Sequence, residues 1–424
     1  IFYTALFHTM LFPREFSEYG RYYSAFDDQI HNGVSYNDYS LWDTFRALHP
    51  LLHFTHPERV NPMIQSLLQM YQEGGWLPKW PNPTYTNIMT GTHADAVIAD
   101  AYVKGFRDYD IDLAYEAIRK NAMQPPFLDT ERVWGDRNEG IHYEARGGLT
   151  YYHSLGYVAA DRTRESVTRT IEFGIDDFAI AQMAKDLGKS EDYDRLMGWS
   201  KNYKNLYNPQ TEFLNARLFD GSWHNNSQEG FTEGGKWTYL FGAMHDIPGM
   251  IELYGGKEKF AQKLDENFND NHYRHDNEPG HHYAYLYNYS GQPWKTQALI
   301  RKHTSTENFR NEALGINGND DCGQMSAWYV FGVMGFYPVT PATEVFAIGA
   351  PQFPELTMQL QKDGKPKSFK ITARNISEEN MYIQSVTLDG KRLDVPFITY
   401  SQIMDGKNLI FEMGKDPNKK AFRK

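Results

Sequence analysis

The chain has very little cysteine, no long apolar run and no cluster of basic residues. Cys322 is the only cysteine in 424 residues, which excludes a framework of intramolecular disulfides but is compatible with an oxidising compartment. No stretch is apolar for long enough to cross a bilayer. The formal net charge is −11 and the Lys and Arg residues are scattered, which argues against nucleic acid as a partner because phosphate binding needs a basic face.

The N-terminus shows neither an initiating Met nor a signal peptide. Residues 1–6 already have a helical character, so we expect the natural protein to begin earlier, and this end does not reveal its localisation. Aromatic residues make up 15% of the chain. Their rings suit carbohydrate binding, but they equally suit a helical core packed with rings, and composition alone favours the core.

Helical periodicity dominates the first three quarters of the sequence. Between Val60 and Tyr71, apolar residues recur at spacings of three and four, and Gly74-Gly75 ends the run. Related patterns predict further helices at about residues 92–105, 167–188, 191–206, 235–254, 257–268, 281–289, 293–303 and 323–334.

Near residue 341 the pattern changes to an alternation of apolar and polar residues. Four such runs, with Asp-Gly turns between them, predict a small antiparallel β module: residues 356–360, 369–373, 381–386 and 409–413. The expected architecture is therefore mainly α. A helical barrel or toroid over residues 1–340 precedes a β-sandwich portion over residues 341–424.

Asp320 and Asp321 lie in a glycine-bounded turn directly before a predicted helix. Acids at a helix start are favoured by the free N–H groups and the dipole there, so a capping role is open. A carboxylate in this turn could equally activate water. Two more acid-bearing turns, around Glu233 and Glu278, favour the second role, because a carboxylate-driven sugar hydrolase needs an acid and a base.

Glu233 is followed by two glycines and then by Trp237 and Tyr239. Apolar neighbours that exclude water raise the pKa of a carboxyl group, as a general acid requires. Glu233 is therefore a candidate acid, although a place in the first turn of a helix from Gly235 also explains it.

Asn277 and Glu278 form a turn that offers oxygen donors suited to Ca²⁺. Several nearby histidines would instead suit Zn²⁺: His272, His275, His281 and His282. The sequence has no His-Glu-x-x-His motif, which makes zinc the weaker choice. A third interpretation has Asn277 capping a short helix that Pro279 opens.

Two further acidic features are ambiguous. Asp43 and Arg46 stand three residues apart, as in a helical ion pair, but a substrate contact is also open. Asp176 and Asp177 resemble the paired acids of an active site, whereas their place inside a long apolar helix favours solvent exposure or a buried polar network at least as strongly.

Long segments throughout the chain resemble the family 92 glycoside hydrolases, the calcium-dependent exo-α-mannosidases. They are residues 39–46, 166–172, 277–279 with 285–287, 291–297, and 318–329 with 335–339. The resemblance implies a catalytic (α/α)6 barrel with β-sandwich elements. It also implies release of terminal α-linked mannose by single displacement with inversion.

The resemblance assigns roles to the residues already singled out. Glu233 matches the general acid and Asp321 the general base, with Asp320 beside it. The implied Ca²⁺ ligands are Asn277, Glu278 and Asp321. The implied sugar contacts, including those to a second sugar, are Trp42, Asp43, Trp76, His275 and Asp276.

Two departures from the family pattern keep alternatives open. The family's N-terminal β-sandwich domain is apparently absent from this sequence, and the residues that follow Glu233 differ from the usual ones. A non-catalytic mannose-binding relative is therefore the alternative function, and an α-1,2 linkage is only a first expectation. The expected location, again by resemblance, is the periplasm, the cell surface or the exterior of a bacterium.

Overall fold

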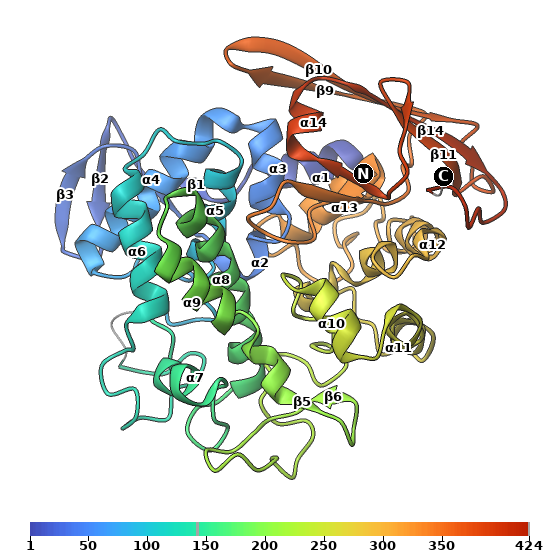
Figure 1. Cartoon of the computed structure of the whole chain (residues 1–424). Helices are drawn as coiled ribbons and strands as arrows, with labels where there is room; N and C mark the ends of the chain where they lie inside the picture. Colours follow the sequence, from blue (N-terminus) through green and yellow to red (C-terminus); the bar gives the residue numbers. More distant parts are fainter. Residues whose placement is uncertain (141–143, 423–424) are drawn as a thin grey trace.

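The computed structural model describes residues 1–140 and 144–422, and its first three quarters are largely helical (Figure 1). The helices lie around a common centre, which fits the predicted toroid. Their bounds are α1 Phe2–His8, α2 Leu41–Thr44, α3 Leu48–Thr55, α4 Pro57–Gly74, α5 Ala94–Val103, α6 Ile111–Met123, α7 Leu149–Leu155, α8 Ser166–Asp186, α9 Ser190–Trp199, α10 Ile247–Leu253, α11 Lys257–Asn269, α12 Pro293–His303, α13 Gln324–Met334 and α14 Tyr400–Met404, with 3-10 turns η1 Asn202–Leu206, η2 Glu278–Gly280 and η3 Tyr283–Asn288.

Helix α4 shows how local sequence sets these bounds. Pro57 occupies its first turn, where the missing N–H costs nothing, and the apolar stripe from Val60 to Tyr71 is buried. Gly75 ends the helix in the left-handed region at φ +86°, as the glycine pair predicts. Helix α8 differs because it is buried on almost every side, with α5, α6 and α9 packed against it.

The predicted helix at residues 235–254 is wrong in its first half. Residues 235–246 form turns, and α10 begins only at Ile247. The Asp246 carboxylate accepts a hydrogen bond from the Gly249 N–H at 3.1 Å, and Pro248 stands in the first turn. This capping pair marks a helix start that apolar periodicity alone does not reveal.

The C-terminal part contains two sheets, with strand orders β12-β11-β14-β10-β9 and β13-β8-β7. Phe336 of one sheet packs against Phe369 of the other, with ring centroids 6.5 Å apart. The strands of the whole chain are β1 Arg14–Glu15, β2 Arg21–Ser24, β3 Gln29–Asn32, β4 Tyr36–Asn37, β5 Tyr207–Asn208, β6 Phe213–Leu214, β7 Phe336–Tyr337, β8 Val345–Ile348, β9 Glu355–Lys362, β10 Lys365–Arg374, β11 Tyr382–Leu388, β12 Lys391–Arg392, β13 Phe397–Thr399 and β14 Asn408–Gly414.

All four runs predicted as strands are strands, but the expectation of a purely antiparallel module is wrong. The last strand, β14, enters the sheet between β11 and β10. It pairs antiparallel with β11 and parallel with β10. Among the described helices, none is both long and apolar enough to cross a membrane.

Candidate active site

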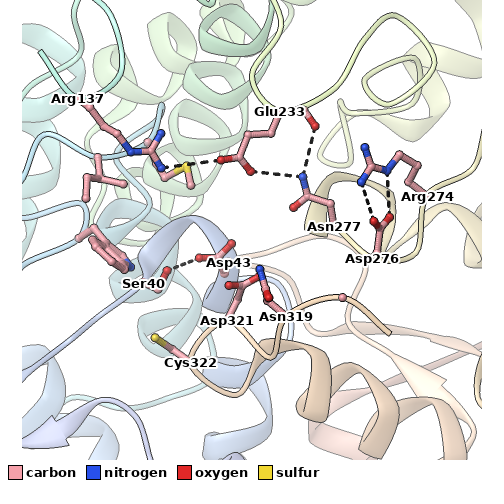
Figure 2. Close-up of a pocket in the computed structure, with 14 residues that line it drawn as sticks. Ser40, Asp43, Arg137, Glu233, Arg274, Asp276, Asn277, Asn319, Asp321 and Cys322 are labelled. Carbon is pink, nitrogen blue, oxygen red and sulfur yellow. Dashed lines mark hydrogen bonds and ion pairs between the residues drawn. The ribbon is translucent and has the colours of Figure 1, made fainter. Parts of the chain in front are cut away.

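A cavity of about 760 Å³ brings together loops that are far apart in the sequence (Figure 2). Acidic side chains dominate its polar lining, and two arginines and one tryptophan add to its walls. The lining residues are Ser40, Asp43, Trp80, Ile88, Met89, Arg137, Glu233, Arg274, Asp276, Asn277, Gly318, Asn319, Asp321 and Cys322. The candidate acid and the candidate base thus face the same space, as the proposed chemistry requires.

Asp43, Glu278 and Asp321 form a compact cluster of carboxylates. One oxygen from each lies within 4.8 Å of the others. Three separate elements supply them: the four-residue helix α2, the 3-10 turn η2 and the turn before α13. Asp43 is the member that the sequence assigned to substrate instead of the metal.

Burial and mutual repulsion perturb all three carboxyl groups. The pKa of Asp43 is raised to about 7, mainly by burial and secondly by the nearby Asp321. The pKa of Glu278 is held well above its usual range, mainly by burial and secondly by the charges of Asp43 and Asp321. The pKa of Asp321 is also raised, chiefly by burial. A cation among them would relieve this repulsion.

The burial of Glu278 is compatible with a cation at this cluster. It is fully buried, and neither carboxylate oxygen receives a hydrogen bond from the described part of the chain. The remaining partners are a proton shared with Asp321 or a positive ion. Carboxylate oxygens are hard donors that suit Ca²⁺ or Mg²⁺ and do not suit Zn²⁺ as well as imidazole does.

Glu233 lies across the cavity from this cluster, with Asn277 beside it (Figure 2). Its side chain is 42% exposed, and the Arg137 guanidinium lies 3.9 Å from its carboxylate. The turn is anchored on one side, where the Thr232 N–H donates to Thr168 of α8 at 3.0 Å. Glu233 itself has φ +51°, outside any helix, so the alternative of a first-turn helix residue is wrong.

The sequence suggested two roles for the turn of Asp320 and Asp321, helix capping and activation of water, and the structure gives the two residues different positions. The Asp320 carboxylate accepts a hydrogen bond from the Ser326 N–H at 3.0 Å and so caps the start of α13. Asp321 turns into the cavity, at φ +43°. Asp320 is therefore placed to support the turn, whereas Asp321 is placed to meet a ligand.

A glycine allows this turn to approach η2 closely. A Cβ on Gly318 would meet the backbone oxygen of Asp276 at 2.5 Å, and the residue has φ +85°. Asn277 also keeps the capping role proposed from sequence, because its side-chain oxygen accepts a hydrogen bond from the Glu278 N–H at 3.1 Å. Capping and cavity lining are thus combined in one residue.

Asp276, one of the predicted sugar contacts, lines the cavity, but three other predicted sugar contacts lie in the interior. Trp42 is 2% exposed and its indole N–H donates to Glu172 at 3.3 Å. Trp76 is buried with Lys120 over its ring. His275 is buried, and its ring lies 4.1 Å from that of Trp328.

The histidine segment packs as part of the aromatic core. Burial holds the pKa of His275 well below its usual range and lowers the pKa of His281 and His282 to about 3. His272 stacks on Trp237, with centroids 4.2 Å apart. In the described ranges, Asp43, Glu278 and Asp321 are the set with metal-binding geometry, so the zinc hypothesis loses its basis.

Several lining residues were missed by the sequence reasoning. Trp80 belongs to the same Trp- and Pro-rich loop as Trp76, so the loop was identifiable but not the ring that faces the cavity. Arg274 forms a two-point ion pair with Asp276, at 3.0 and 2.6 Å. Arg137 follows Asp136, whose carboxylate accepts from the Met89 N–H at 2.5 Å, and no sequence signal distinguished it.

Comparisons with known proteins identify a family and several similar proteins. The sequence model of the glycosyl hydrolase family 92 catalytic domain matches residues 1–415. An uncharacterised secreted glycosidase of Arthroderma benhamiae is 32% identical, over 84% of this chain and 50% of that protein.

Two solved structures from Bacteroides thetaiotaomicron are also similar. A family GH92 α-mannosidase has a TM-score of 0.89 and 36% identity, over 99% of this chain and 56% of its own. An inverting mannosidase of the same family has a TM-score of 0.90 and 33% identity, over 100% of this chain and 60% of its own. The chain thus spans between half and three fifths of the length of these relatives. It belongs to glycosyl hydrolase family 92.

Proposed function

We propose that this protein is an exo-α-mannosidase that cleaves terminal mannose by a single displacement with inversion. The observation that carries the proposal is the shared cavity, in which Glu233 and Asp321 approach one space from opposite sides. The relatives named as α-mannosidase and as inverting mannosidase support the choice of sugar and of stereochemistry. A third structure of this kind was solved with mannoimidazole.

Glu233 would act as the general acid. Its partly exposed carboxyl group lines the cavity and would give its proton to the glycosidic oxygen of the leaving sugar. Asn277 donates from its side-chain amide to one oxygen of this carboxylate at 3.4 Å, and the other oxygen lies 3.9 Å from the Arg137 guanidinium.

Asp321 would act as the general base. It would take a proton from a water molecule as the water oxygen attacks the anomeric carbon and the bond to the leaving oxygen breaks. An inverting pair of carboxyl groups needs about 6.5–9.5 Å between its members, so that water fits beside the sugar. The position of Asp321 at the base of the cavity, opposite Glu233, supports this role.

Asp43, Glu278 and Asp321 would hold the cation, and Asn277 is placed beside them. Their oxygen donors, and the unpartnered buried oxygens of Glu278, fit Ca²⁺. When bound, calcium would hold vicinal hydroxyls of the terminal mannose and favour a distorted ring. The chain's own part is to bring three carboxylates within reach of that sugar.

The expected substrates are mannose-containing oligosaccharides or glycoprotein glycans outside the cytoplasm. The secreted glycosidase among the relatives supports an exported protein.

Incubation of the full-length protein with small α-mannosides, with and without EDTA, tests the function. We expect mannose release that stops on chelation and recovers with Ca²⁺, and proton NMR should show β-mannose as the first product. Initial release of α-mannose would contradict inversion. Tight mannoside binding without turnover would instead support a non-catalytic glycan-binding relative.

A further inference from the structure

Ionisable side chains form a network beneath the cavity, in the interior of the helical part. All are at most 3% exposed, so the substrate does not reach them. The members are Asp95, His93, Arg146, Glu172, Asp176 and Asp177. The network includes the Asp176-Asp177 pair and the Glu172 segment, which the proposed mechanism does not use.

His93 lies between two carboxylates of α8. Its Nδ1 is 2.8 Å from Asp176 Oδ1, and its Nε2 is 3.0 Å from Glu172 Oε2, the latter an ion pair without hydrogen-bond alignment. Burial opposes a charge on His93, but the two carboxylates outweigh it and raise the pKa to about 9. A charged His93 therefore fixes Glu172 from one side at neutral pH.

The network ends at Glu172, whose other oxygen reaches toward the cavity elements. Glu172 Oε1 accepts from the Trp42 indole N–H at 3.3 Å and lies 3.6 Å from the Arg46 guanidinium. Arg46 also donates to the backbone oxygen of Trp42 at 3.1 Å. Phe45 stacks on His93, with centroids 4.3 Å apart and planes within 18°.

These contacts all converge on helix α2 and the residues that follow it. Helix α2 has four residues, Leu41–Thr44, which is too short to be stable by its own hydrogen bonds. It carries Asp43, a member of the cation cluster. The position of Asp43 in that cluster thus depends on the contacts that Trp42, Phe45 and Arg46 make with the buried network.

We propose that Glu172 is a positioning residue that fixes α2 through Trp42 and Arg46, and so keeps Asp43 in the geometry that a cation requires. Groups behind the direct ligands commonly decide metal affinity in this way, because they orient the ligands before the ion arrives. The network also gives Asp176 a role, since it fixes His93 and thereby Glu172. The part of this inference that concerns calcium rests on the proposed function.

The test compares Glu172→Gln with a matched control, Asp177→Asn, in the full-length protein. Both substitutions remove one buried carboxylate of the same helix and network. Asp177 contacts Arg146 and Tyr152, at the end of the network away from α2. Two quantities are measured: hydrogen exchange of the backbone amides of residues 41–48, and Ca²⁺ affinity by calorimetry.

In Glu172→Gln we expect these amides to exchange about tenfold faster or more. We expect Ca²⁺ affinity to fall by about 10- to 100-fold. Asp177→Asn should lower Tm to a similar extent while changing both quantities by less than about threefold. Unchanged exchange in Glu172→Gln, or an equal effect of Asp177→Asn, would overturn the positioning role.

A second variant covers the case in which Glu172→Gln does not fold. Trp42→Phe removes the indole N–H but keeps the charges of the network, and it should speed exchange at residues 41–48 in the same direction. Wild-type exchange in folded Trp42→Phe would then contradict the proposal. If the wild-type protein binds no Ca²⁺, the cation part of the proposed function fails, whereas hydrogen exchange still decides the role of Glu172.

Discussion

The side-chain amide of Asn277 donates both to the Glu233 carboxylate and to the Glu233 backbone oxygen, at 3.4 Å in each case. The next residue in the chain, Glu278, belongs to the carboxylate cluster. Two consecutive residues therefore connect the candidate acid to the candidate cation site. The 3-10 turn that begins at Glu278, with Asn277 as its N-cap, thus helps to set the distance between the proton donor and the candidate cation site.

Calcium should stabilise the protein more strongly as pH rises through about 7. Burial and Asp321 raise the pKa of Asp43 to about 7, above its value in the unfolded chain. A carboxyl group with a raised pKa stabilises the fold at low pH, and this stability is lost as pH rises through the folded pKa. Ca²⁺ binds the ionised form, so its effect should grow over the same range.

The measurement is the difference in Tm between Ca²⁺ and EDTA at pH values from 5 to 8. At a Ca²⁺ concentration 100 times Kd the stabilisation should approach about 2.7 kcal/mol near pH 8. Asp43→Asn is the control and should flatten the pH dependence. A Ca²⁺-induced shift of equal size at pH 5 and pH 8 would contradict this account of the cluster.

Glu278→Gln should abolish stabilisation by calcium and, at pH values high enough to ionise Glu278, should stabilise the calcium-free protein. Burial and the neighbouring carboxylates raise the pKa of Glu278, and its ionised form lacks a hydrogen-bond donor, which costs the native state about 1–3 kcal/mol. It also removes one of three anionic oxygens from the cluster. Urea unfolding with and without Ca²⁺ measures both effects. A lower stability in EDTA would show that Glu278 has a partner among the protein groups.

Trp80→Ala should weaken substrate binding, whereas Trp76→Ala should weaken the fold. Trp80 lines the cavity, and loss of its ring should raise KM for a mannoside by up to about tenfold, since a ring contact contributes about 0.5–1.5 kcal/mol. Trp76 is buried, so truncation should cost about 3–5 kcal/mol of stability. Steady-state kinetics and thermal unfolding of both variants separate the two roles. The opposite pattern would restore Trp76 as the sugar contact.

Local sequence predicted most of the secondary structure, because helices such as α4, α11 and α12 carry their own periodicity and end signals. Prediction from local sequence was wrong where tertiary contacts determine the secondary structure. Residues 235–246 have apolar spacing that resembles a helix, yet they are turns, in which the Tyr239 and Phe241 rings are buried. The parallel pairing of β10 with β14 was also beyond local reasoning, because it depends on where the last strand enters the sheet.

The acidic turns were predictable because glycine and carboxylates mark them, but their combination in space was not. Asp43 joins Glu278 across most of the chain, and no local pattern links the two residues. Trp76 and Trp80 have similar neighbours in one loop, so only the fold decides which ring meets the cavity. His275 resembled a ligand in sequence and proved to be a core ring, because apolar and aromatic neighbours arrive from distant segments.

The most direct test compares Glu233→Gln and Asp321→Asn on two substrates, a mannose disaccharide and a mannoside with an activated aryl leaving group. We expect both variants to lose about 10²–10⁴-fold in kcat/KM on the disaccharide. The aryl leaving group needs no proton, so Glu233→Gln should recover much of its activity on that substrate and Asp321→Asn should not. Equal losses of both variants on both substrates would contradict the assignment of Glu233 as acid and Asp321 as base.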